Sequence, residues 1–556
     1  MLGCAAVAAG SRQRLIGTTL GLAAFAALAL APGAGARANG FKFGVTAADV
    51  TSDSAILWAK ASRSGTAEIQ IVRRGGFGRC DPEDAPANRR VNAKRSNDNT
   101  VQKKVKKLDA DTAYKYRFCM DGGRRSETGR FTTAPDAKSK QTINFALSGD
   151  QDARPSPGQS EPYWNRFEVW DRIRAQQNDF NVLLGDTMYS DTEVPGYTLA
   201  DVALTVKQKW QAYRTNLAMK PWTKARGSAA YYGGWDDHEF VNDFARGESV
   251  FPLGVGDVNI DGEELYKRGV RAFTDYNPIA YKKQTGLYRS VRWGKNLEIF
   301  FLDERSFRSN SADYLGNCDS PAGSGNPDVA PTAPQSTRNR FTPLVPALAG
   351  PAPAACLAAI NDPSRTMLGS AQMAKFKRQV ANSKATFKVI FSEVPVQQYY
   401  ILPYDRWEGY EAERVELLRY LQGIENVVFL TTDVHANLVN DARFRTLEPG
   451  GPENSGITAV VTGPVATANY ALEISDNVGN PAAGELATSL FLKPQPPEGV
   501  GMQCAATAQF SYAQVEVSRN ELTVDLLDSN DQPVRDTGNL SVPGAPPCAQ
   551  VVIPKQ

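Results

Sequence analysis

From about residue 141 onward, the sequence alternates apolar runs typical of buried strands with segments of helical spacing. Short apolar runs predict strands at 142–148, 180–184, 297–302, 387–391 and 427–431. Apolar residues recur at helical spacing in 161–177, and a further helix is predicted over 411–423. This order predicts an α/β core whose central strands are buried. After Gly456 the pattern returns to strands, and 513–527 resembles a hairpin that closes a sheet.

Acidic residues follow these strands at their carboxyl ends. The groups are Asp150 and Asp152, Asp186 and Tyr189, Asp303 and Arg305, Asp433 and His435, and the run 235–239 with Asp236, Asp237 and His238. The whole chain has two histidines, and both lie beside acids. Ligands of open α/β sheets bind at these strand ends, where converging carboxylates repel one another unless a cation neutralises them. The pattern therefore predicts one metal-centred hydrolytic site.

Each piece of this pattern also has a purely structural interpretation. An isolated Gly-Asp after a strand is usually a turn, an Asp-x-His pair is often a surface hydrogen bond, and Asp236 can serve as a helix N-cap. The combination favours a site, because separate strand ends carry these groups in an order that would build one pocket. Carboxylates with imidazoles and a phenolate suit iron, manganese or calcium better than a metal that prefers thiolates.

Several ordered segments carry a resemblance to a known family. They are LGDTMY at 184–189, WDDHE at 235–239, LDERSFR at 302–308, RTMLGSAQ at 365–372, SEVP at 392–395, WEGYEAER at 407–414 and DVHA at 433–436. On these segments the chain resembles the alkaline phosphatase D (PhoD-like) family, within the calcineurin-like metallophosphoesterase superfamily. The resemblance implies an α/β (α+β) sandwich of two mixed sheets flanked by helices. A small all-β sandwich of the fibronectin or immunoglobulin type would precede it.

The resemblance also implies a cluster of two or more metal ions, iron (or manganese or zinc) with calcium, that binds a phosphate ester. It assigns Asp186 to a bridge between two ions, Asp150, Tyr189 and His435 to one ion, and Asp237 and Asp433 to the other. His238 would then protonate the leaving group. Arg305 would contact the phosphate, with a structural salt bridge as the alternative.

The chain departs from the family pattern at one predicted ligand. Family members often have a cysteine, as a ferric-iron ligand, where this chain has Asp150. The wider fold often has a histidine where this chain has Asp152, so we count Asp152 only as a further candidate ligand. These departures leave the identity of the metals open.

The function that we expect is a secreted metal-dependent phosphoesterase that hydrolyses monoesters, diesters or both by means of a metal-activated hydroxide. A phospholipase D-like phosphodiesterase that acts on phospholipid head groups is the first alternative. A secreted binding protein with a structural metal site is the second. The partner expected is a small phosphate ester or a phospholipid. The net charge of +2 argues against nucleic-acid binding driven by bulk electrostatics, and we expect a monomer.

The domain organisation expected is a β-sandwich over 40–135, followed by a catalytic domain over 141–556. Short strands predicted at 54–59, 67–72 and 114–118, separated by turn residues, indicate the sandwich. Within the catalytic domain, 309–365 is a long insertion rich in Gly, Pro, Ala and Ser. It is either a lid over the site or a decorated surface loop, and we favour the loop.

The N-terminus is typical of an export signal. Arg12 and Arg14 precede a short apolar stretch, and residues 34–38 offer cleavage after Ala36 or Ala38, so we expect cleavage and a periplasmic or extracellular protein without a transmembrane anchor. The Sec and twin-arginine routes both stay open.

The cysteines indicate disulfides, because removing Cys4 with the signal leaves six of the seven. Sequence proximity suggests the pairs Cys80–Cys119, Cys318–Cys356 and Cys504–Cys548, although six cysteines allow many connectivities.

Overall fold

The computed structural model describes residues 40–556, apart from 251–259, 449, 494–499 and 538–544. The predicted export signal at 1–38 therefore lies outside the described residues. In the part of the chain that the structure describes, none of the helices has the length and apolar character needed to span a bilayer.

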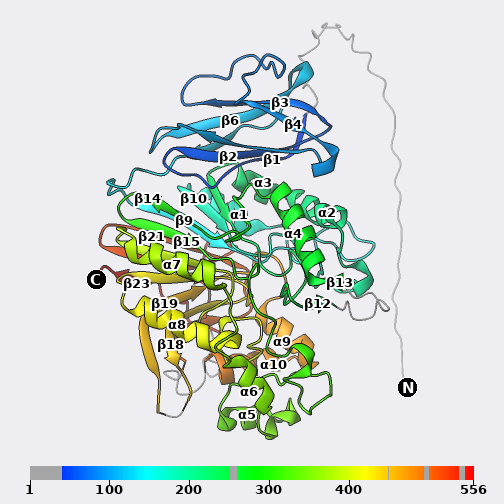
Figure 1. The fold of residues 1–556 in the computed structure, drawn as a ribbon, viewed down its shortest axis with the longest axis vertical. Helices are drawn as coiled ribbons and strands as arrows, with labels where there is room; N and C mark the ends of the chain where they lie inside the picture. The colour runs from blue at the N-terminus through cyan, green and yellow to red at the C-terminus, as the bar shows by residue number, and fades with distance from the viewer. Residues whose placement is uncertain (1–39, 251–259, 449, 494–499, 538–544) are drawn as a thin grey trace, which may run out of the picture. The chain divides into compact units, whose positions relative to one another are not determined.

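Two large mixed sheets form the centre of the described chain (Figure 1). The first has the order β23 (Val551–Pro554), β22 (Glu521–Asp528), β21 (Ser511–Val517), β9 (Ile143–Ser148), β10 (Phe180–Leu183), β11 (Ala230–Gly233), β1 (Phe41–Ala48), β2 (Ser54–Ala61), β5 (Thr100–Lys106). The second has the order β14 (Arg289–Trp293), β15 (Leu297–Phe301), β16 (Phe387–Ser392), β17 (Val427–Thr431), β19 (Glu453–Val461), β18 (Asn437–Arg445), β20 (Met502–Ala506). Strands β9, β10 and β11 are parallel, as are β15, β16, β17 and β19.

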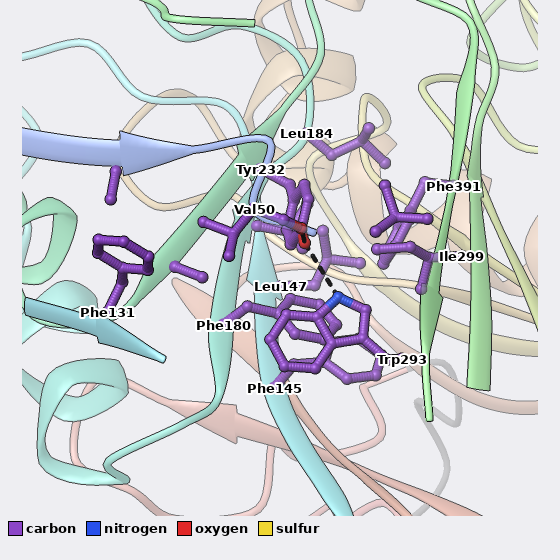
Figure 2. Packing of buried hydrophobic residues seen from close by; sticks show 14 of the residues in the cluster. Val50, Phe131, Phe145, Leu147, Phe180, Leu184, Tyr232, Trp293, Ile299 and Phe391 are labelled. Atoms are coloured by element: carbon purple, nitrogen blue, oxygen red, sulfur yellow. Dashed lines mark hydrogen bonds between the residues drawn. The ribbon is translucent and has the colours of Figure 1, made fainter. Parts of the chain in front are cut away.

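The two sheets pack face to face through aromatic side chains. Because side chains alternate across a strand, Phe145 and Leu147 of β9 face the second sheet, while Ala146 faces the helices. The ring of Phe145 meets that of Phe391 edge-on at 6.0 Å. Trp293 of β14 donates through Nε1 to the hydroxyl of Tyr232 of β11 at 2.9 Å (Figure 2). This inter-sheet core holds the carboxyl ends of strands from both sheets in one region.

Helices cover the outer faces of the two sheets. Those on the first sheet are α1 (Glu168–Ala175), α2 (Val206–Leu217), α3 (Lys220–Arg226) and α4 (Gly262–Tyr276). Those on the second sheet are α7 (Ser370–Asn382) and α8 (Glu411–Gln422). Both flanking layers agree with the predicted two-sheet metallophosphoesterase sandwich. Helix α1 begins at Glu168 rather than at 161, because Phe167 adopts a left-handed conformation (φ 63°) and its N–H binds the side chain of Asn165.

The N-terminal part of the described chain is all-β, as predicted. Strands β3 (Gly65–Val72), β4 (Arg90–Ala93), β6 (Ala113–Met120), β7 (Arg124–Arg125) and β8 (Gly129–Thr132) form a further sheet. This sheet packs on β1, β2 and β5, for example through the rings of Phe41 and Phe118 at 5.9 Å. Strand β1 also pairs in parallel with β11 at Ala47 and Ala48, so the first sheet continues from the N-terminal part into the core. The predicted domain boundaries and the likeness to fibronectin or immunoglobulin sandwiches stay predictions.

The insertion at 309–365 is folded where it was expected to be a long loop. It holds α5 (Gln335–Phe341) and α6 (Ala354–Ile360), which Figure 1 draws beside α9 (Tyr470–Val478) and α10 (Ala483–Ala487). Arg338 makes two hydrogen bonds of 2.8 Å with Asp328, and both side chains are buried. The remaining elements are β12 (Ser249–Val250), β13 (Ile260–Asp261), η1 (Arg95–Asn97), η2 (Asp121–Gly123), η3 (Leu199–Asp201), η4 (Tyr314–Gly316), η5 (Pro346–Ala349), η6 (Trp407–Tyr410) and η7 (Thr488–Leu492).

All three predicted disulfides are confirmed. Cys80 pairs with Cys119 in the N-terminal part, Cys318 pairs with Cys356 across the insertion, and Cys504 pairs with Cys548 near the C-terminus. Each pair is close in sequence, so each closes a short loop. The second one brackets the insertion, as predicted.

Candidate metal centre

The loops at the carboxyl ends of strands from both sheets meet at one place. Thr432, which follows β17 of the second sheet, donates its hydroxyl proton to the carbonyl of Leu184, which follows β10 of the first sheet, at 2.8 Å. Gly149, which follows β9, packs against this contact. A Cβ atom at position 149 would lie 2.5 Å from the carbonyl oxygen of Leu184 and 2.8 Å from Cγ2 of Thr432. The contact therefore requires a glycine at 149, and it brings the acid-bearing loops together.

Four of the predicted ligands have an uncommon backbone conformation. The φ angles of Asp150, Asp186, Asp433 and His435 are 60°, 43°, 74° and 52°. Non-glycine residues rarely adopt positive φ, and such strain gathers at functional sites, where the surrounding structure enforces it. The positive φ angles carry a conformational free-energy cost, which the packing of the rest of the fold must offset.

One group of candidate ligands consists of Asp150, Asp186 and His435, whose ligand atoms lie within 4.8 Å of one another. The hydroxyl of Tyr189 lies 3.1 Å from Nε2 of His435, so the phenol reaches the same group. Neither oxygen of Asp150 has a hydrogen-bond partner, although the residue is 0% exposed. Burial raises the pKa of Asp150 to about 7 and that of Asp186 well above its ordinary value. A buried, unpartnered carboxylate such as that of Asp150 fits a bound cation.

A second group consists of Asp186, Asp237 and His238, again within 4.8 Å. Asp237 accepts the backbone N–H of His238 at 2.8 Å, and its other oxygen accepts the backbone N–H of Asp243. The N–H of His238 also approaches Asp186 at 3.3 Å. Asp186 is thus common to both groups, which is the position that a bridging ligand requires.

His238 is oriented by a carboxylate that the sequence did not single out. Its Nδ1 lies 2.7 Å from Oδ1 of Asp191, and Asp191 is itself held by the N–H of Asn242 at 2.7 Å. The imidazole stacks on the ring of Tyr189, with centroids 4.0 Å apart. Burial lowers the pKa of His238, but Asp191, Asp237 and Asp186 outweigh it and raise that pKa well above its ordinary value. Asp191 lies in the same loop as Asp186, and no spacing in the sequence marks it.

Asp433 interacts with the charges of several neighbouring carboxylates. Burial is the main cause that raises its pKa, followed by the charges of Asp236, Asp405 and Asp237. Among the described residues, however, no group of closely spaced ligand atoms includes Asp433. A further group that the sequence did not predict joins Asp237 with Asp243 and Asp405. Whether Asp433 ligates a metal stays a prediction.

Arg305 is fully buried among carboxylates. Its Nε binds Asp236, while Nη1 and Nη2 bind the two oxygens of Asp405 at 2.5 and 2.6 Å. Arg308 binds the same Asp405 at 2.7 Å. These contacts support the alternative of a structural salt bridge more than the predicted contact with a phosphate.

Asp152 is also held by its neighbours. Its Oδ1 accepts the N–H of Arg154 at 2.9 Å, and its Oδ2 accepts the hydroxyl of Thr192. The side chain belongs to none of the candidate ligand groups in the described chain. The geometry therefore gives no support to Asp152 as a ligand.

Comparisons with known proteins agree with this arrangement. A family model described as PhoD-like phosphatase matches residues 156–526, and a model of the N-terminal domain of PhoD-like phosphatases matches residues 27–135. Alkaline phosphatase D of Bacillus subtilis (strain 168) is 22% identical over 442 residues, which cover 71% of this chain and 64% of that protein. The match thus spans less than two thirds of the curated relative.

Two solved structures share the fold. One, described as the structure of PhoD, has a TM-score of 0.66 at 17% identity and covers 93% of this chain and 91% of that one. The other, the purple acid phosphatase PPD1 of yellow lupin (Lupinus luteus), has a TM-score of 0.50 at 12% identity and covers 90% and 74%. At these identities the likeness concerns the fold alone.

Proposed function

Because the chain belongs to the PhoD-like phosphatase family, we propose that it is a hydrolase of phosphate esters that works with two or more metal ions. The observation that carries the proposal is the pair of ligand groups that share Asp186. Asp150 and His435 complete one group, and Asp237 completes the other, in which His238 lies beside the two carboxylates as the proposed proton donor. A buried carboxylate without partners, such as Asp150, is unfavourable unless a cation binds it.

The residues that would hold the ions are those with oxygen and imidazole donors around Asp186. We assign Asp150, Tyr189 and His435 to one ion and Asp237 and Asp433 to the other. When bound, such ions lower the pKa of a water ligand towards ~7 and offset charge on the phosphoryl oxygens. The donor set contains no thiolate, so iron, manganese or zinc in the first position and calcium in the second suit it.

His238 would supply the proton for the leaving group. Asp191 binds Nδ1, which leaves Nε2 as the nitrogen that can donate to a departing oxygen. The stacked ring of Tyr189 restricts rotation of the imidazole. Asp191 thereby fixes both the tautomer and the direction of the proton donor, in the manner of the carboxylate–histidine pairs of other hydrolases.

The experiment that tests the proposal combines metal analysis with rates on three substrates. We expect the purified protein to contain two or more metal ions and to hydrolyse p-nitrophenyl phosphate, bis(p-nitrophenyl) phosphate or phosphatidylcholine. Asp186→Asn should remove both the metal and the activity, because this residue serves both groups. A wild-type protein that holds no metal, or an Asp186→Asn variant that keeps full activity, would contradict the proposal. The rates also decide between a monoesterase and a phospholipase D-like diesterase.

Export is part of the proposal. Three disulfides occur among the described residues, and disulfides persist mainly in oxidising compartments. Together with the predicted signal at 1–38, they support a periplasmic or extracellular protein. We also propose that the protein is a monomer, which sedimentation velocity would test.

A further inference from the structure

His435 presents one nitrogen to the candidate metal group and the other to a different pair of acids. Its Nε2 lies 3.1 Å from the hydroxyl of Tyr189, on the side of Asp150 and Asp186. Its Nδ1 is buried without a hydrogen bond of good geometry, 3.6 Å from Oε2 of Glu473. Glu193, Glu473 and His435 together form a further group whose ligand atoms lie within 4.8 Å of one another. A buried ring nitrogen that faces two carboxylates needs an explanation.

The two carboxylates are not equivalent. Glu193 already accepts the hydroxyl of Thr467 at 2.5 Å and the N–H of Ala468 at 3.2 Å, both through Oε2, and these bonds tie it to that loop. Glu473 lies in the first turn of α9, and its one ion pair within the described chain is with His435. Glu473 is therefore the carboxylate that is available to the imidazole.

Helix α9 is anchored at the same histidine. The N–H of Tyr470, the first residue of α9, donates to the carbonyl of His435 at 3.1 Å. Asn469 caps the helix by accepting the N–H of Leu472 at 3.1 Å. This start of the helix fixes where Glu473, on the same turn, can point. The side chain thus faces His435 because the helix is attached to the backbone of His435.

We propose that Glu473 is a positioning residue of the metal centre, whose carboxylate accepts the Nδ1 proton of His435 and so directs the Nε2 lone pair at the metal. The inference rests on the proposed function, in which His435 is a ligand. A neutral imidazole carries one proton, so the group that accepts it decides which nitrogen is free to bind a metal. The proposal requires the 3.6 Å distance between Nδ1 and Oε2 of Glu473 to shorten to a hydrogen bond in the metal-loaded protein.

The test compares Glu473→Ala with Glu193→Ala, a matched control that removes the same charge beside the same imidazole. Zinc affinity is measured by competition with a chelator. Removing an outer carboxylate partner of a ligating histidine typically lowers metal affinity by roughly 10–100-fold. We expect such a loss for Glu473→Ala, a smaller one for Glu473→Gln, which keeps a neutral acceptor, and a smaller one for Glu193→Ala. Thermal unfolding of the metal-free variants checks that each folds.

A second readout does not depend on affinity. The chain has two histidines, so ¹⁵N-histidine NMR of the zinc-loaded protein gives two imidazoles, and a His238→Ala variant assigns them. We expect the Nδ1 proton of His435 to be protected from solvent exchange in the wild type and in Glu193→Ala. In Glu473→Ala it should shift and exchange faster. A structural role of Glu473 in α9 alone would not change this proton.

The outcomes distinguish a failure of the positioning role of Glu473 from a failure of the proposed function. If Glu473→Ala and Glu193→Ala lose equal zinc affinity, or if the His435 Nδ1 proton is unchanged in Glu473→Ala, the positioning role is wrong. A wild type that binds zinc at His435 but hydrolyses no phosphate ester with any metal contradicts the proposed function and leaves the role of Glu473 decided by the NMR result. A wild type that binds no metal overturns both.

Discussion

We propose that the carboxylate of Asp150 determines what kind of metal the first candidate ligand group prefers. Both of its oxygens are buried and unpartnered, and the group around it otherwise offers Asp186, a phenol and an imidazole. Oxygen donors favour harder ions, whereas a thiolate at this position would favour softer ones. In the proposed centre, a single side chain would therefore set the metal preference without any change in the fold.

Replacing Asp150 by cysteine tests this point. We expect the variant to gain a thiolate-to-iron charge-transfer band when it is loaded with ferric iron, and to shift its preference from Mn²⁺ towards Cd²⁺ by about 10-fold or more. Visible absorption spectra and competitive metal binding measure the two effects. Tyr189→Phe is the control, because it removes the phenolate and adds no thiolate. An Asp150→Cys variant whose spectrum and metal preference match those of the wild type would contradict the role of Asp150.

His238 and Asp191 make a prediction about leaving groups. His238→Ala should keep the metal but lose about 10²–10⁴-fold in rate on alkyl phosphates, and much less on p-nitrophenyl phosphate, whose leaving group needs no proton. Asp191→Asn should act in the same direction with a smaller loss, since it removes the acceptor at Nδ1. Asp201→Asn, which changes an exposed cap at η3, is the matched control. Equal losses on good and poor leaving groups would rule out the acid role.

The loops that follow β11 and β15 are joined by a buried network of ions. Arg305 and Arg308 both bind Asp405, which precedes η6, and Arg305 also binds Asp236. Burial alone would raise the pKa of Asp405, but the two arginines hold it below its ordinary value. The stabilisation is therefore present above the unfolded pKa of ~3.9 and is lost as the pH falls towards the lower folded value.

Removing Asp405 should uncouple these loops. Asp405→Asn leaves two buried arginines without their shared partner, so we expect the free energy of unfolding of the metal-free protein to fall by about 3–5 kcal/mol at pH 7. The loss should shrink below pH ~4, where the wild type itself weakens. Denaturant titrations at several pH values measure both effects. Glu161→Gln, in an exposed pair with Arg166, should change stability by less than about 1 kcal/mol. A similar small change for Asp405→Asn would show that the network is not structural.

The N-terminal strands are built into the first sheet of the whole molecule. Strand β1 pairs with β11, and the indole of Trp58 in β2 donates to the carbonyl of Asp275 in α4 at 2.8 Å. The inter-sheet core and the N-terminal core form one continuous cluster of buried apolar side chains. The N-terminal part therefore covers an edge of the first sheet, which carries part of the candidate metal centre.

Deleting residues 40–135 tests this continuity. The deletion would expose the edge of β11 and apolar surface that is now buried, and exposed edges and patches of this kind promote aggregation. We expect the remaining chain to be insoluble or to unfold without cooperativity. Solubility after expression, followed by circular dichroism and thermal melting, measures the outcome. A soluble, cooperatively folded fragment that keeps its metal would show that the two parts fold independently.

The sequence determined much of this fold because its patterns are local. Every strand predicted for the core is present, since a buried apolar run with β-branched and aromatic residues has few alternatives. The predicted start of α1 was too early. The apolar residues keep helical spacing from Trp164 onward, but the backbone at Phe167 is left-handed and the helix begins only at Glu168. The disulfide pairs also followed from proximity in the chain.

Only the tertiary structure decided how the site residues meet. The sequence by itself placed Asp150, Asp186, Asp237 and His435 at strand ends, because an acid after a buried run is visible in one dimension. It did not reveal Asp191, Asp405 or Glu473, and it left open whether Arg305 would face a phosphate or a carboxylate. Those roles depend on the packing of loops from two sheets and on helix α9, which bring together side chains 38 to 100 positions apart. Contacts of that range arise from the folded core and leave no local pattern in the chain.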